Sequence, residues 1–131
     1  GALNSLSALA SNDIWAVGEA GSNTLVEHWD GTSWSIVSSP NGPSQSALIS
    51  VSAVSPQDIW AVGETSNDLE QPLAMHYDGT AWKLTEVPAP GVADQLTGVA
   101  AVPGGHPFAV GTTVQGHAPY RRHALVIRDG S

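Results

Sequence analysis

The chain has 131 residues, a formal net charge of −8 and no cysteine. Phosphate backbones and anionic membrane surfaces are bound through Lys and Arg, so the four basic residues argue against nucleic-acid and membrane partners. The lack of cysteine excludes disulfides and thiolate metal sites in this sequence.

The composition predicts a globular, turn-rich domain. The chain is 41% hydrophobic and contains 14 Gly and 9 Pro, which differs from the composition of disordered segments. It has no run of about 18 apolar residues, so we expect no membrane span. It also shows no charged leader before an apolar stretch, so we expect no signal peptide here. A cysteine-free, acidic chain rich in Ser, Thr and Gly is compatible with an extracellular or cell-surface bacterial protein.

Four short strands are predicted at the start of the chain. Apolar residues alternate with small ones over Leu3–Leu9, which indicates a first strand. Ile14–Gly18 is a nearly continuous apolar run, typical of a strand buried on both faces. The third strand is Leu25–Trp29, and the hairpin signal Asp30-Gly31 leads into a fourth at Trp34–Val37.

The same four-strand pattern then repeats. The segment Asp13–Glu19 recurs without change as Asp58–Glu64, and the motif of His28–Trp34 recurs as that of His76–Trp82. Two independent motifs at a common spacing of roughly 45–48 residues indicate duplicated supersecondary units. A worn third copy has Phe108 in place of Trp. The corresponding later strands are Leu48–Val54, Leu73–Tyr77 and Trp82–Thr85 in the second unit, and Leu96–Val102 and Ala124–Arg128 in the third.

Four antiparallel strands per unit of about 45 residues predict the blades of a β-propeller. The expected fold is all-β, with about three four-stranded blades at residues 2–46, 47–94 and 95–131. The third blade lacks its last strand, because the chain ends where the next copy of Thr32–Pro40 would begin. Large rings at equivalent positions are predicted to fill the wedges between blades: Trp15, Trp60, Phe108, Trp34 and Trp82.

The paired motifs, Asp-Ile-Trp-Ala-Val-Gly and Trp-Asp-Gly-Thr-x-Trp, resemble the tryptophan-rich β-propeller repeats of bacterial, often extracellular, proteins. The Asp-Gly-Thr-x-Trp hairpin is also similar to the Asp-box turn of sialidase-like propellers and to kelch blades. The resemblance covers nearly the whole chain and implies a blade fold. It implies no single function, since propellers host many.

Repeated polar residues are predicted to be structural. Asp13 and Asp58 are expected to cap turns, and the predicted hairpin residues are Asp30, Gly31, Asp78, Gly79, Asp129 and Gly130. Calcium at these turns is an alternative, but the dense carboxylate spacing of a calcium loop is missing. No metal or cofactor is predicted.

Two further pairs of repeated residues are predicted to have structural rather than catalytic or metal-binding roles. Glu19 and Glu64 start from equivalent environments, whereas a glycosidase needs two different carboxylates, so hydrogen bonding at the rim is preferred to catalysis. His28 and His76 have Ile127 as their third copy, so a packed interior histidine is preferred to a metal ligand.

A local binding site is expected where the repeat is broken. The connection Thr112–His123 carries five residues without repeat equivalents of the same type: His117, Tyr120, Arg121, Arg122 and His123. An arginine pair beside tyrosine can hold a carboxylate or phosphate bidentately. The alternatives are a solvated loop and a contact to another chain.

The first functional hypothesis is a non-enzymatic binding or structural module whose rim loops meet a protein or glycan partner. The second is a lectin that uses exposed aromatics such as Trp29 or Tyr77. The third and weakest is a sialidase-like glycoside hydrolase. That resemblance implies three arginines from separate blades, whereas Arg121, Arg122 and Arg128 lie in one segment.

Three blades are too few for a closed propeller, which typically has about four to eight. The open arc would expose apolar sheet faces, so we expect self-association into a six-bladed ring made by two copies. The alternative is that the remaining blades belong to a longer chain.

Overall fold

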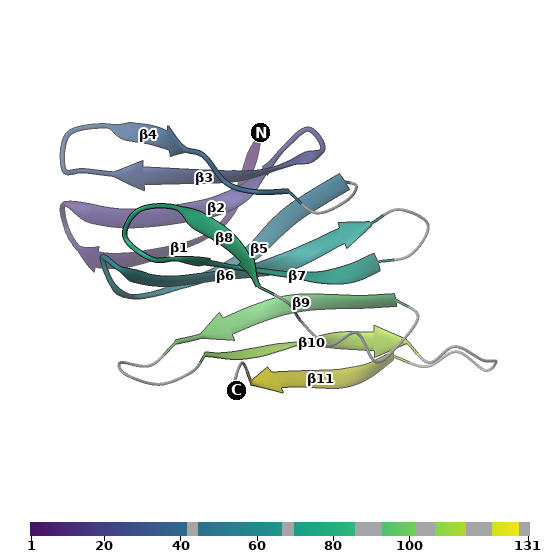
Figure 1. Ribbon diagram of the computed structural model, residues 1–131. Helices are drawn as coiled ribbons and strands as arrows, with labels where there is room; N and C mark the ends of the chain where they lie inside the picture. The colour runs from purple at the N-terminus through teal and green to yellow at the C-terminus, as the bar shows by residue number, and fades with distance from the viewer. Residues whose placement is uncertain (42–44, 67–69, 86–92, 102–106, 115–121, 129–131) are drawn as a thin grey trace.

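The computed structural model describes residues 1–41, 45–66, 70–85, 93–101, 107–114 and 122–128. These residues form three antiparallel β-sheets stacked against one another (Figure 1). None of the described segments contains a helix long and apolar enough to cross a membrane. The all-β prediction is confirmed.

Each sheet uses its strands in sequence order, as a propeller blade does. The first contains β1 (Ala2–Ala10), β2 (Asp13–Ala20), β3 (Asn23–Trp29) and β4 (Trp34–Val37). The second contains β5 (Gln45–Ser55), β6 (Asp58–Ser66), β7 (Glu70–Tyr77) and β8 (Trp82–Thr85), and the third contains β9 (Ala93–Ala100), β10 (Phe108–Val114) and β11 (Arg122–Arg128).

The strands lie where the repeat places them, and most are longer than predicted. β4 and β8 have the predicted limits, whereas β5 begins at Gln45 and β9 at Ala93, each two residues before the expected blade boundary. Within the described residues the third sheet has three strands, with β11 at its edge. These three strands agree with the strands predicted for the third unit.

The glycine that ends each apolar run allows the two inner strands of a blade to approach closely. The pairing of β5 with β6 shifts register between Leu48 and Ser50, next to the position opposite Gly63. A Cβ atom on Gly63 would lie 2.0 Å from the carbonyl oxygen of Ala47. Gly18 has the same position beside the bulge of β1, so a side chain is excluded at both sites.

The main core lies between the first and second sheets. Its buried residues come from β2 and β3 on one side and from β5 to β8 on the other: Trp15, Val17, Val26, Leu48, Val51, Ile59, Ala61, Leu73, Met75 and Trp82. A smaller core between the second and third sheets contains Val62, Ala74, Leu96 and Ala109. Described sheets therefore cover the second sheet on both faces, whereas they cover the first and third on one face each.

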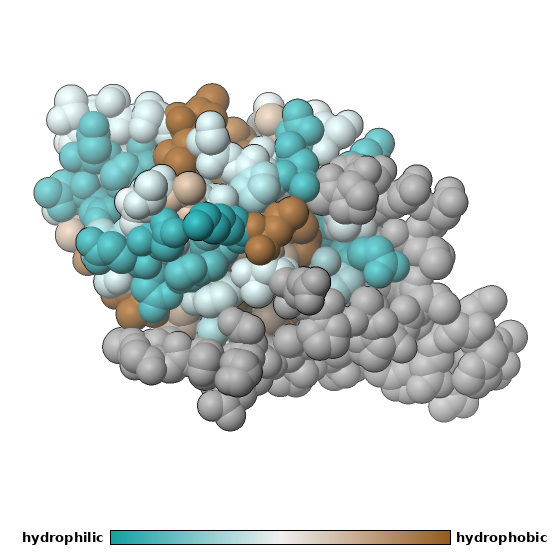
Figure 2. Space-filling view, viewed as in Figure 1, coloured by the Kyte–Doolittle hydropathy of each residue, from teal (hydrophilic) through white to brown (hydrophobic). Residues whose placement is uncertain are grey.

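Some apolar side chains are exposed on the outer strands for a reason unrelated to the ends of the arc. Ile36 on β4 and its repeat equivalent Leu84 on β8 are both exposed. Figure 2 shows brown groups over the part of the view where Figure 1 places these two strands, within a mainly hydrophilic surface. Leu84 pairs with the buried Met75 and yet is 48% exposed, so the neighbouring sheet does not cover this position on the outer strand even where a sheet is present.

Candidate functional site

The predicted binding loop lies largely outside the described residues. His117, Tyr120 and Arg121 fall in an undescribed range, whereas Arg122 and His123 begin β11, where their backbones pair with Val114 and Thr113 of β10. Asp129 and Gly130 are also outside the described ranges. The arginine–tyrosine anion site therefore stays a prediction.

The repeated glutamates line one small cavity at the rim between the first and second sheets. Glu19 and Glu64 stand near the ends of β2 and β6, around a cavity of about 90 Å³ that Gly21, Gln45 and Ser46 also line. The backbone N–H of Ser46 donates a 2.9 Å hydrogen bond to the carbonyl oxygen of Ser22. The described lining contains no basic side chain, so its chemistry is that of a polar rim.

The aspartates expected to cap turns bind histidines instead. Asp13 Oδ1 lies 2.7 Å from His28 Nε2, and Asp58 Oδ1 lies 2.8 Å from His76 Nε2. Each pair joins the second strand of a blade to the third. The Nε1–H of Trp60 also donates to Asp58 Oδ1 at 3.1 Å. The turn-cap prediction for Asp13 and Asp58 is corrected, because a ring on the adjacent strand faces each carboxylate.

Both histidines are half-buried and pack against tryptophans with tilted rings. The ring centroids of His28 and Trp15 are 4.4 Å apart, and those of His76 and Trp60 are also 4.4 Å apart. The prediction of satisfied histidines is consistent with these pairs. Among the described residues no group of three or more His, Cys, Asp or Glu could hold a metal ion.

The hairpin predictions for Asp30 and Asp78 are confirmed. Asp30 Oδ1 accepts hydrogen bonds from the backbone N–H groups of Thr32 and Ser33, at 2.8 and 3.0 Å. Gly31 has a φ of 99° and Gly79 a φ of 98°, which a glycine adopts without strain.

Asp78 makes the same two bonds, to the backbone N–H groups of Thr80 and Ala81. The donated hydrogen bonds stabilise the carboxylate in both hairpins and lower the pKa values of Asp30 and Asp78.

The contact between the first and second sheets, which we call the inner joint, is an aromatic cluster. The Trp15 ring lies 4.8 Å from the Tyr77 ring and 5.8 Å from the Trp82 ring, measured between centroids. Tyr77 and Trp82 are 5.5 Å apart. Trp15 of one blade therefore packs against two rings of the next, at distances typical of favourable aromatic pairs.

Serine hydroxyls connect the first strands of neighbouring blades. The backbone N–H groups of Val51 and Ala53 donate to Ser5 Oγ and Ser7 Oγ, at 3.3 and 3.1 Å. This role of the serines was not predicted from the sequence.

The second pair of sheets repeats the arrangement, since the N–H groups of Val99 and Ala101 donate to Ser50 Oγ and Ser52 Oγ at 3.3 and 3.0 Å. A usable signal was present, because Ser5 and Ser7 recur as Ser50 and Ser52 at the repeat spacing.

Three of the five predicted core rings are not fully buried. Trp15 and Trp82 are 4% and 5% exposed, which confirms the prediction for both. Trp34 is 43% exposed and Phe108 is 45% exposed, so the prediction is wrong for these two. Trp60 is half-buried.

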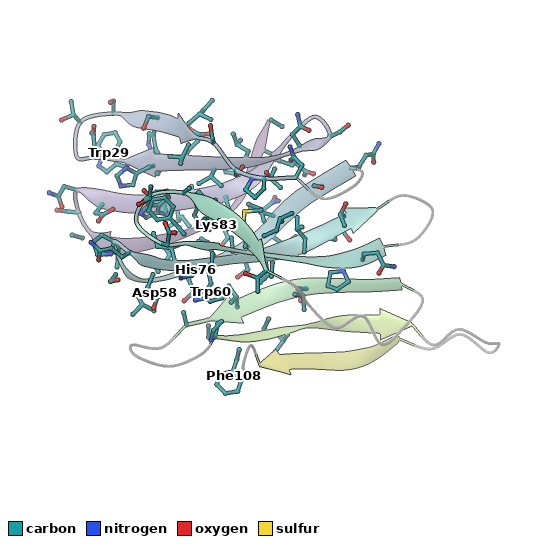
Figure 3. The ribbon with its side chains drawn as sticks, viewed as in Figure 1. Trp29, Asp58, Trp60, His76, Lys83 and Phe108 are labelled. Carbon is teal, nitrogen blue, oxygen red and sulfur yellow. The ribbon has the colours of Figure 1, made fainter. Side chains whose placement is uncertain are left out.

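The cause is the position of each ring in the arc. Trp34 lies on the face of the first sheet that no described sheet covers, and Phe108 on the corresponding face of the third. Trp60 points toward the third sheet, whose described part has no counterpart of β8 to supply a ring like Trp82. Figure 3 shows Phe108 and Trp29 at opposite ends of the stack, with Phe108 projecting away from the other sheets.

Comparison with known proteins supports the fold. No family model and no curated protein sequence matches the chain. Among solved structures, "YCF48 bound to D1 peptide", a β-propeller protein, superposes with a TM-score of 0.61 at 17% sequence identity. The chain folds as propeller blades. The match covers 92% of this chain and 39% of that one, so the chain spans well under half of the protein it resembles.

Proposed function

We propose that this chain is a non-enzymatic binding or structural module of an extracellular or cell-surface bacterial protein, and that two copies close a six-bladed ring. The observation that carries the proposal is the exposure of apolar side chains on both end faces of the arc. Leu6 is 65% exposed on the first sheet, and Val110 is 47% exposed on the third. Their counterparts Val51 and Val17 are buried at the inner joint. Apolar faces of this kind are aggregation liabilities unless a partner covers them.

A second argument comes from ring size. The chain spans 39% of YCF48, and closed propellers typically have about four to eight blades. Two copies with three blades each fall within that range, and a ring leaves no end face open. We also propose that the chain is related to the tryptophan-rich β-propeller repeat proteins. The two repeated motifs support this relationship.

Light scattering coupled to size-exclusion chromatography tests the ring. The chain has a mass of 13.5 kDa, and the expected result is a stable particle of twice that mass over a wide concentration range. A monomer that persists at high concentration contradicts the two-copy ring. It would favour a longer chain as the source of the remaining blades.

A lectin is the alternative function, and one observation favours it. Trp29 and Trp34 lie 5.7 Å apart between ring centroids, and Trp34 is half exposed, so the pair offers an aromatic surface for stacking on a sugar. Tyr77, the other aromatic candidate, packs into the inner joint instead. A glycan array tests this function: specific binding that Trp34→Ala abolishes would support the lectin, and an empty array would support the module.

A glycoside hydrolase is the weaker alternative. The rim cavity is lined by two carboxylate residues, Glu19 and Glu64. We expect no turnover of a chromogenic glycoside panel. Turnover that is lost in Glu19→Gln or Glu64→Gln would overturn the non-enzymatic assignment.

The rim loops are the proposed contact region for a protein or glycan partner. YCF48 was solved with a D1 peptide bound, which supports peptide binding as one use of such a fold. The undescribed loop that carries Tyr120 and Arg121 is the first place to test. Replacing both residues by alanine should abolish partner binding without changing particle mass, and a partner that still binds would exclude this loop.

A further inference from the structure

The two end faces of the arc reproduce the two halves of the inner joint. The first-blade open face consists of Leu3, Leu6, Trp29 and Trp34, which occupy the repeat positions of Leu48, Val51, Tyr77 and Trp82. The third-blade open face consists of Gly98, Ala100, Phe108 and Val110, which occupy the positions of Ser5, Ser7, Trp15 and Val17. The inner joint shows how such faces fit together.

We propose that the third-blade open face of one copy docks on the first-blade open face of a second copy, with Phe108 packed against Trp29 and Trp34. The proposal rests on the two-copy ring and assigns its joints. Each ring would contain two identical head-to-tail joints, and each copy would contribute one face to each joint. The occupant of each face is thus a second copy of this chain.

The aromatic rings of the two open faces match those of the inner joint in position and in total size. Trp29 and Trp34 are 5.7 Å apart, close to the 5.5 Å between Tyr77 and Trp82 at the inner joint. Phe108 is smaller than the Trp15 that it replaces, whereas Trp29 is larger than Tyr77. These two changes compensate each other across the joint, and volume-conserving changes are the kind that packed cores tolerate best.

The inner strands show a second compensating change. At the inner joint Ser5 lies opposite Val17 and Ser7 opposite Trp15, whereas on the third-blade open face Gly98 and Ala100 lie opposite Val110 and Phe108.

The loss of two hydroxyls leaves an apolar hollow of about 280 Å³, lined by Gly98, Val99, Ala100, Phe108 and Val110. Leu6, which is one carbon larger than the Val51 whose place it takes, is the side chain that this hollow would receive. A larger side chain on one face and a hollow on the other indicate that the two faces fit each other.

One position departs from the inner joint and gives a sharp test. Glu27 on the first sheet stands where Met75 is fully buried on the second. At a joint built like the inner one, a carboxylate at this position opposes association, because burial removes it from water. The variant Glu27→Met should therefore tighten the two-copy particle by at least about tenfold in dissociation constant.

Complementation between two variants tests the head-to-tail arrangement. Leu6→Glu damages only the first-blade open face, and Phe108→Glu damages only the third-blade open face. Both positions are exposed in the single chain, so each variant should still fold. Each variant alone has two damaged joints and should run as a monomer by light scattering. An equimolar mixture should recover particles of twice the chain mass, because one joint in the mixed pair is undamaged.

Ile36→Glu is the matched control, since Ile36 is more exposed than Leu6 and its repeat equivalent Leu84 remains 48% exposed at the inner joint. It should leave the particle mass unchanged. If the unmodified chain is monomeric, the two-copy ring and this joint both fail.

If the unmodified chain forms the particle but the Leu6 and Phe108 variants still associate, or their mixture does not recover the particle, the joint is wrong while the two-copy ring stands. A tightened particle in Glu27→Met supports the joint, and no change in affinity contradicts it.

Discussion

The inner joint and the two open faces are built from the same repeat positions, yet their residues have different surroundings. Trp15 and Trp82 are buried, whereas their equivalents Phe108 and Trp34 are half exposed. The difference arises because a blade completes its neighbour's core and has little core of its own. In a repeat fold, the burial of a side chain therefore depends on the adjacent unit as much as on the residue.

Two buried N–H groups destabilise the inner joint, whereas the N–H group of Trp60 is hydrogen-bonded. The Nε1–H groups of Trp15 and Trp82 are buried without a hydrogen-bond acceptor among the described residues. Trp60 keeps its bond to Asp58. A buried polar group without a partner costs about 1–3 kcal/mol, so aromatic packing must outweigh this cost at the inner joint.

The largest expected effect distinguishes the two repeat-equivalent tryptophans. Trp15→Ala should lower the free energy of unfolding by about 3–5 kcal/mol, the usual range for deleting a buried large aromatic. Trp60→Ala should cost clearly less, because Trp60 is half-buried. Urea denaturation at one fixed protein concentration measures both. Equal losses would show that the second joint is as complete as the first.

A smaller effect is expected from adding a methyl group beside the bulge. Gly63→Ala should destabilise by about 1–3 kcal/mol, because the new Cβ would strike the backbone of β5. Gly18→Ala should cost less, since the new Cβ would strike β1, which starts at the exposed residue Ala2 and has no described sheet of this chain beyond it. Thermal melts of the two variants measure the difference, and the reverse order would contradict the view that the central blade is the more constrained.

Removing one interblade hydroxyl tests the contact between first strands. Ser7→Ala should cost about 0.5–1.5 kcal/mol, the usual contribution of one hydrogen bond. It should also speed hydrogen exchange at the Ala53 amide, which donates to Ser7. Ser52→Ala should do the same for Ala101 at the second joint. The exposed Ser35 is the control, and equal exchange rates in Ser35→Ala and Ser7→Ala would exclude the contact.

The smallest effect concerns the hairpin aspartates and pH. The pKa of Asp78 is lowered by hydrogen bonds from Ala81 and Thr80, so the folded state favours the charged form. Its contribution to stability is complete above the pKa that an aspartate has in the unfolded chain. The contribution is lost as the pH falls through the lower, folded-state pKa. Asp78→Asn should therefore reduce the melting temperature slightly at pH 7 and hardly at all in strong acid. A constant difference between the variant and the unmodified chain across this range would contradict the carboxylate's role.

The local pattern of residues along the chain was enough to predict the β-strands. Alternation, turn residues and the repeated motif located every described strand, and β4 and β8 have the predicted limits. The Asp-Gly hairpins were also predictable, because Gly31 and Gly79 need only a local backbone conformation. The partner of Asp13 was not, since His28 lies on a different strand and reaches the carboxylate only through strand pairing. The joint serines were missed because their acceptor role depends on the next blade.

The sequence by itself determined the repeat and the order of strands, because these follow from residue spacing along the chain. Only the tertiary structure decided which of the equivalent rings are buried. Trp15 and Phe108 occupy one repeat position, but a covering sheet faces the first and none in the described structure faces the second. Burial depends on contacts between blades, and the spacing of residues within one blade does not show which of its faces another sheet covers.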